Sequence, residues 1–176
     1  FFLIGTNTAD CHPVIFNRIK RRKQSDPDHV KVIVVDPRAT RTSAIADLHL
    51  AIRPGSDVAL LNGMLYVMLK SGYLDHEFIA NHTKNFAEVM AMVEQYPPQV
   101  AATICDIPVD DLIEAALLFG KANNALSFWS MGVNQSTSGV AKTNGIINLH
   151  LATGKIGKSG SGPFSLPGQP NQMGGR

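Results

Sequence analysis

Short apolar runs alternate with helical segments over the first third of the chain. Residues 1–4 form a continuous apolar run that stops at Gly5, and residues 30–35 form a second run rich in Val and Ile. Runs of this kind are typical of strands that are buried on both faces of a parallel sheet. Residues 12–23 between them have a helical pattern. A strand, a helix and a strand in this length predict a βαβ unit with a right-handed crossover.

The alternation continues to residue 154. Residues 48–52 and 125–129 predict a third and a fourth strand. The intervening patterns predict helices at 58–69, at 75–82 and 85–94 (each opened by an Asx cap), from Pro108 onward, and at 139–153. The first of these is apolar almost all round, so it should be deeply buried, with Ser56 as its cap. The prediction is an α/β fold, a Rossmann-like parallel sheet with flanking helices.

Residues 155–176 have a different composition. They are rich in Gly, Ser and Pro and show no apolar period. This predicts a long loop after a helix that ends at Gly154. Long loops within enzymes are often functional, so the chain divides at residue 154 into an α/β region, 1–154, and a Gly/Pro-rich loop, 155–176.

Composition narrows the class of protein. The 176 residues suffice for one domain, and 17% of them are charged, below the usual value of about 25%. The low charge and the absence of an initiator Met favour a piece of a larger enzyme. A net charge of +2 and 7% aromatic residues argue against nucleic acid as a partner. No apolar run reaches the length of a transmembrane helix, so no membrane association is expected.

Four polar turns are the candidate ligand site. They are residues 5–10, 36–40, 54–57 and 131–135, and each follows one of the predicted strands. Because the carboxyl ends of parallel strands meet at one edge of a sheet, the four turns should lie together, where such sheets bind ligands.

Each turn suits part of a nucleotide. Gly5 lets backbone amides approach a pyrophosphate, although the dinucleotide fingerprint GxGxxG is absent. Asp36 ends a strand where an acid can accept from ribose hydroxyls, and Arg38 can meet a phosphate. Asp57 can accept from the donor edge of guanine. Each residue also has a simpler interpretation: Gly5 as an ordinary turn glycine, Asp36 as part of a strand-ending turn and Asp57 as a helix-capping acid. Their placement together favours a nucleotide site.

Other chemistries find little support. The six histidines lack zinc spacings, and no Walker or Gly-x-Ser-x-Gly sequence is present, so no metal ligand is assigned. Cys11 and Cys105 are interpreted as small hydrophobic residues, and two cysteines cannot form an iron–sulfur cluster by themselves. A basic cluster at residues 18–23 is either a solvated helix end or, less simply, a site for an anion.

Five segments carry a resemblance to a known family. Residues 5–13, 36–42, 46–57, 129–137 and 168–176 closely resemble, in order along the whole chain, the molybdopterin oxidoreductases. That family binds two molybdopterin guanine dinucleotides and one molybdenum. Within it, the chain is most similar to the catalytic subunit of assimilatory nitrate reductases. Formate dehydrogenases usually carry Thr where Asn134 stands and differ in the last segment; a formate dehydrogenase-like enzyme is the alternative.

The resemblance implies roles for individual residues. Those implied to bind the cofactor are Gly5, Thr6, Asn7, Thr8 and Ala9 along one dinucleotide, Asp36, Arg38 and Thr40 at its ribose and phosphates, Gly55, Ser56 and Asp57 at its guanine, and Met131, Gly132 and Gln135 near the pterin. Gln169 and Arg176 are implied to lie near the substrate. The guanidinium of Arg176 is a charged fork that suits a planar oxyanion such as nitrate.

The resemblance also implies what lies outside this chain. The iron–sulfur and molybdenum-binding cysteines of the family lie upstream, and the main domain for the second dinucleotide lies downstream. The expected parent enzyme is cytoplasmic and reduces nitrate to nitrite with electrons from ferredoxin, flavodoxin or an NADH-linked subunit. Residues 1–154 would then bind the dinucleotide, and 155–176 would be an active-site loop. Another possibility is that the fragment folds but binds no cofactor and has no activity on its own.

Overall fold

The computed structural model describes residues 1–168 and contains one parallel sheet. The strands are β1 (Phe2–Ile4), β2 (Ile33–Val35), β3 (Leu48–Leu50), β4 (Leu126–Trp129) and β5 (Gly162–Ser165). Their order across the sheet is β3-β2-β1-β4-β5, and each neighbouring pair is parallel. This confirms the predicted Rossmann-like α/β fold.

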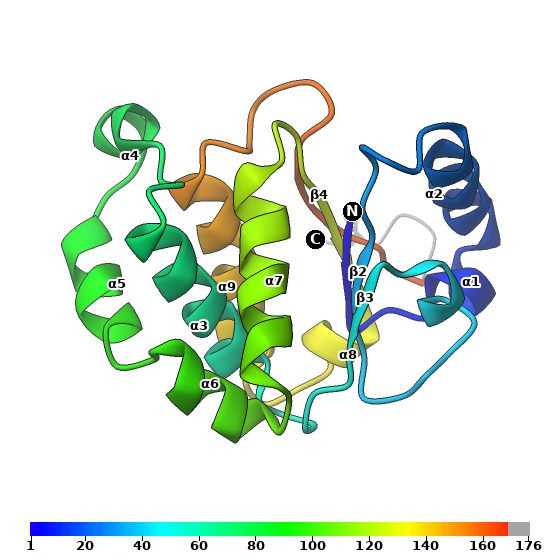
Figure 1. Ribbon diagram of the computed structural model, residues 1–176, viewed down its shortest axis with the longest axis horizontal. Coiled ribbons are helices and arrows are strands. Elements are labelled where there is room, and N and C mark those ends of the chain that lie inside the picture. Colours follow the sequence, from blue (N-terminus) through cyan, green and yellow to red (C-terminus); the bar gives the residue numbers. More distant parts are fainter. Residues whose placement is uncertain (169–176) are drawn as a thin grey trace, which may run out of the picture.

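Helices cover both faces of the sheet unequally (Figure 1). On one face lie α1 (Thr8–Cys11), α2 (Pro13–Ser25) and the 3-10 turn η1 (Ser43–Ile45). On the other face lie α3 (Asp57–Lys70), α7 (Val109–Lys121) and α9 (Gly139–Ala152). Beyond these are α4 (His76–His82), α5 (Phe86–Val93) and α6 (Pro98–Cys105), while α8 (Met131–Asn134) lies at the end of β4.

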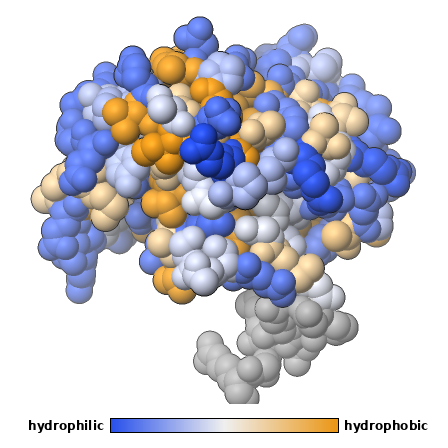
Figure 2. Space-filling view, turned by 90° about the horizontal axis from the view of Figure 1, so that it is seen from below, coloured by the Kyte–Doolittle hydropathy of each residue, from blue (hydrophilic) through white to orange (hydrophobic). Residues whose placement is uncertain are grey.

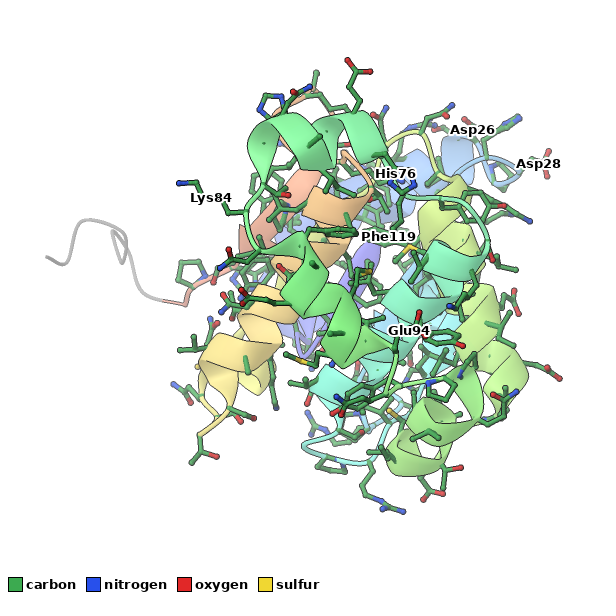
Figure 3. The ribbon with its side chains drawn as sticks, turned by 90° about the vertical axis from the view of Figure 1, so that its left-hand side faces the viewer. Asp26, Asp28, His76, Lys84, Glu94 and Phe119 are labelled. Carbon is green, nitrogen blue, oxygen red and sulfur yellow. The ribbon has the colours of Figure 1, made fainter. Side chains whose placement is uncertain are left out.

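The core follows the alternation of side chains along the strands. Phe2 and Ile4 face the thicker helical layer, and Leu3 between them packs with Ile19 of α2. The helix α3 is buried along most of its length, as its apolar sequence predicts. Phe119 of α7 lies inside this layer (Figure 3), with its ring edge-on to those of Phe2 and His150 at 5.9 and 5.2 Å between centroids.

The four predicted strands are confirmed, but several local predictions are wrong. Residues 162–165, expected to be loop, form the fifth strand; β5 is an edge strand, which tolerates the missing N–H of Pro163. The hydroxyl of Ser56 does not cap α3 but donates to the carbonyl of Arg53 at 2.7 Å. The side chain of Asp75 caps α4 as predicted, whereas that of Asn85 does not cap α5.

Three short helices were not predicted. The helices α1 and α8 fall in segments predicted to be polar turns, and α6 falls in a segment for which no element was predicted. No helix within residues 1–168 has the length and apolar character needed to cross a bilayer. The division of the chain into regions 1–154 and 155–176 stays a prediction.

Candidate cofactor site at the carboxyl edge of the sheet

The candidate site lies at a topological switch point. From the central strand β1 the chain proceeds to β2 and β3 on one side, and later to β4 and β5 on the other. The loops that follow β1 and β4 therefore leave the sheet in opposite directions and open a crevice, which is where open α/β sheets bind ligands. The carboxyl ends of the strands point downward in Figure 1, so Figure 2 looks onto this edge.

The turns after β1 and β4 touch through two glycines. The amide of Gly132 donates to the carbonyl of Gly5 at 3.0 Å. A Cβ on Gly132 would lie 2.7 Å from that carbonyl oxygen, and Gly5 has a φ of 57°. Gly5 is therefore required both by its left-handed conformation and by the close approach of α8. Met131 beside it is 47% exposed at this edge.

The turn after β1 is organised by side-chain hydroxyls. Thr6 and Thr8 are buried, with their Oγ1 atoms 3.3 Å apart. The Oγ1 of Thr42, which follows β2, accepts from the amide of Ala9 at 3.0 Å and donates to the Oδ1 of Asn7 at 3.0 Å. The candidate residues Asn7, Thr8 and Ala9 are thus held in place from the neighbouring turn.

Asp36 ends β2 as an Asx turn. Its Oδ1 accepts from the amide of Arg38 at 2.9 Å, and its carbonyl oxygen accepts from the Nε2 of His49 at 2.9 Å. Arg38 is exposed, and the Oγ1 of Thr40 accepts from the amide of Thr42 at 3.3 Å. The turn at the end of β2 is therefore present, as one of the two interpretations of Asp36 predicts. Within residues 1–168, the Oδ2 of Asp36 has no hydrogen-bond partner.

Asp57 already has a charged partner. Its Oδ2 lies 2.7 Å from the Nζ of Lys142 in α9, and the two side chains are only 9% and 5% exposed. Ser56 is buried beside it, whereas Gly55, with a φ of 92°, has open space around its Cα. Burial raises the pKa of the nearby Cys105 thiol, which donates to the carbonyl of Ser56 at 3.5 Å, as suits an inert residue.

The sequence of the whole chain identifies its family. Residues 1–175 match the molybdopterin oxidoreductases. The chain belongs to this family. Family membership implies a molybdenum–pterin cofactor.

Relatives within the molybdopterin oxidoreductases include enzymes named for different substrates. The chain is 57% identical to a nitrate reductase of Synechocystis over 99% of its length. It is 44% identical to a periplasmic nitrate reductase of Desulfovibrio desulfuricans and 40% identical to subunit alpha of an F420-dependent formate dehydrogenase of Methanococcus maripaludis. Among solved structures, acetylene hydratase from Pelobacter acetylenicus matches 90% of the chain and 22% of its own, with a TM-score of 0.83 and 27% identity. The chain spans about a quarter of the length of these nitrate and formate relatives.

The polar groups at this edge suit a polar ligand such as the molybdenum–pterin cofactor that the family implies. Within residues 1–168 the buried Nδ1 of His12 has no hydrogen-bond partner. At Asp36, in the same part of the chain, the protein's one hydrogen bond to the carboxylate goes to Oδ1. The other ring nitrogen of His12 lies 3.3 Å from the carbonyl oxygen of Pro167. A buried ring nitrogen without a protein partner is a position where a polar ligand group can be accommodated.

The structure brings some of the predicted site residues together. The turns that contain Gly5, Asp36 and Met131 share one edge, and Gln135 ends α8 there. Gln169 and Arg176 lie outside the described residues. No group of three or more His, Cys, Asp or Glu side chains suited to a metal occurs within residues 1–168.

Sequence reasoning missed Thr42 and Lys142 as parts of this edge. Thr42 belongs to a segment that carries the family resemblance, but nothing in the sequence indicates its partner 35 residues earlier. Lys142 lies in a predicted helix, where a lysine ordinarily faces water.

Proposed function

We propose that the protein containing this chain is a molybdenum-dependent nitrate reductase, and that this chain binds molybdopterin guanine dinucleotide. The observation that carries the proposal is the placement of the turns after β1, β2 and β4 at one switch-point edge. It is supported by 57% identity to a nitrate reductase across 99% of the chain.

In this proposal each turn binds a different part of the dinucleotide. The turn at Gly5–Ala9 lies against the pyrophosphate, the open carboxylate oxygen of Asp36 accepts from a ribose hydroxyl, and Arg38 and Thr40 lie at a phosphate. Gly55, Ser56 and Asp57 lie toward the guanine, and Met131, Gly132 and Gln135 toward the pterin. When bound, the cofactor supplies the molybdenum that takes oxygen from nitrate and delivers two electrons, with a second dinucleotide and an iron–sulfur cluster held by the remainder of the enzyme.

Nitrate is favoured over formate by the order of similarity. The nitrate reductase of Synechocystis is 57% identical to the chain, and the formate dehydrogenase subunits of Methanococcus maripaludis are 40% and 36% identical. We further propose an assimilatory, cytoplasmic enzyme that receives electrons from ferredoxin, flavodoxin or an NADH-linked subunit. Formate oxidation is the second candidate, because formate dehydrogenases are among the relatives at 40% identity or more.

Arg176 provides the test of substrate class. In the full-length enzyme, Arg176→Lys keeps the positive charge but loses the planar fork, so the Michaelis constant for nitrate should rise while molybdenum content stays unchanged. Arg176→Ala should raise it further. Gln169→Ala is a companion variant on the same segment.

The kinetics are measured on preparations of known molybdenum occupancy, with formate tested as a substrate in parallel. Loss of molybdenum from both Arg176 variants would assign this residue to the cofactor and remove its role with nitrate. Turnover of formate without turnover of nitrate by the wild-type enzyme would overturn the proposed substrate.

A further inference from the structure

Thr42 connects the turn after β1 with the turn after β2. It is fully buried at the carboxyl edge, and its Oγ1 makes two hydrogen bonds of 3.0 Å, accepting from the amide of Ala9 and donating to the Oδ1 of Asn7. Thr42 follows the turn after β2 (residues 36–40) and precedes η1, whereas Ala9 and Asn7 belong to the turn after β1. Its hydroxyl therefore joins two segments that are more than 30 residues apart in sequence.

The link continues outward through a chain of side chains. The Nδ2 of Asn7 donates to the Oδ2 of Asp10 at 2.7 Å, and the guanidinium of Arg41 donates to the Oδ1 of Asp10 at 3.2 Å. Because Arg41 precedes Thr42, the chain of contacts closes into a ring between the two turns. The outer part of this ring is solvated, since the Arg41 side chain is 81% exposed. The ion pair between Arg41 and Asp10 therefore contributes little to stability. The inner hydroxyl is the buried member.

The short helix after β1 depends on this contact. The helix α1 has four residues, and the side chain of Asn7 at its N-cap does not cap it. A single turn of helix does not hold its conformation alone, since nucleation is unfavourable and few internal bonds form. The amide of Ala9 is satisfied from outside by the Oγ1 of Thr42, so this hydroxyl links α1 to the segment that follows β2.

We infer that Thr42 is a positioning residue that holds the turn after β1 in register with the turn after β2, so that the two can bind the diphosphate and ribose of one nucleotide together. The inference rests on the proposed function. Thr42 acts through Ala9 and Asn7, because its hydroxyl proton and one of its two lone pairs are used by these residues. A hydroxyl suits this position because a single oxygen atom accepts from one neighbour and donates to the other.

Conservative variants of the full-length enzyme separate positioning from packing. Thr42→Val keeps the shape and removes the hydroxyl, whereas Thr42→Ser keeps the hydroxyl and removes a methyl group. Thr153→Val is the matched control. Thr153 is also buried, and its Oγ1 donates at 2.7 Å to the carbonyl of Leu149; it lies at the C-terminal end of α9, away from the carboxyl edge of the sheet. The measurements are guanine nucleotide and molybdenum per chain, the rate of nucleotide release from the folded enzyme, and the melting temperature of cofactor-free enzyme.

Thr42→Val should release the nucleotide on the order of tenfold faster than wild type, the effect of one buried hydrogen bond. Thr42→Ser should release it at close to the wild-type rate, and Thr153→Val should lower only the melting temperature. Equal release rates for Thr42→Val and Thr153→Val at matched melting temperatures would overturn the inference. Absence of guanine nucleotide from the wild-type enzyme would instead overturn the proposed function, so the two failures are distinguishable.

Discussion

Lys142 and Asp57 form an ion pair of 2.7 Å that joins the first turn of α9 to the first turn of α3, with less than a tenth of either side chain exposed. The pair lies at the carboxyl edge of the sheet, next to the proposed guanine end of the site. Removing two charges from water is expensive, so each charge depends on the other.

Removing one member of the pair should destabilise the protein by about 3–5 kcal/mol, because the remaining charge is left buried and uncompensated. We expect this for Lys142→Met and, to a smaller extent, for Asp57→Asn. The double variant should recover much of the loss. Urea unfolding of the four proteins, analysed as a double-mutant cycle, measures the coupling.

The same double variant tests whether Asp57 also recognises guanine. If it does, Asp57→Asn with Lys142→Met restores stability but not retention of guanine nucleotide in the full-length enzyme. Wild-type nucleotide content in a stable double variant would assign Asp57 to structure alone.

Gly132→Ala should separate the turns after β1 and β4. A Cβ at this position would lie 2.7 Å from the carbonyl oxygen and 2.8 Å from the Cα of Gly5, both backbone atoms that have no room to yield. We expect a loss of about 1–3 kcal/mol in stability and reduced cofactor content. Gly168→Ala is the control, since nothing lies within 4 Å of its added Cβ. Similar unfolding curves for the two variants would contradict the close approach.

His150 should make stability depend on pH below neutrality. It is fully buried, its Nε2 lies 2.7 Å from the Oγ of Ser127 and its Nδ1 2.8 Å from the carbonyl oxygen of Lys155, and burial lowers its pKa from 6.5 to about 4. As pH falls below 6.5, His150 becomes protonated in the unfolded chain, whereas in the folded chain it stays neutral until about pH 4. Stability is therefore lost across that window, by up to about 3 kcal/mol.

Urea unfolding of the 176-residue chain between pH 7.5 and 4 measures this loss. The variant His150→Gln lacks the titrating ring and should show a shallower profile over the same window. Parallel profiles for wild type and variant would show that other groups carry the pH dependence.

The strands could be predicted where burial on both faces makes a continuous apolar run, as in residues 1–4. The segment 162–165 has no such apolar run, since its sequence is Gly-Pro-Phe-Ser. It forms a strand because it pairs with the neighbouring strand β4. Local sequence also cannot show that Ser56 is drawn away from its helix by the carbonyl of Arg53.

The site was predictable at the level of turns and not at the level of partners. The position of Asp36 after a strand predicts an acceptor for ribose hydroxyls; its side chain is buried, and within residues 1–168 the protein's hydrogen bond to the carboxylate goes to Oδ1 alone. The partner of Asp57 lies 85 residues later on another helix, so its ion pair is a product of tertiary packing. The same holds for Thr42, whose two contacts exist only once α1 and the turn after β2 are adjacent.

The position of β1 at the centre of the sheet has a consequence for biosynthesis. Phe2 is paired on one side with Ile33 and on the other with Ser127. While the chain emerges from the ribosome, β1, β2 and β3 can assemble early, but one edge of β1 stays unpaired until about 75 further residues, from the end of β3 at Leu50 to the start of β4 at Leu126, have been made. During that interval the apolar edge is open to pairing with another nascent chain. A translational pause within α4–α7 should therefore lower the yield of soluble protein more than a pause after β4.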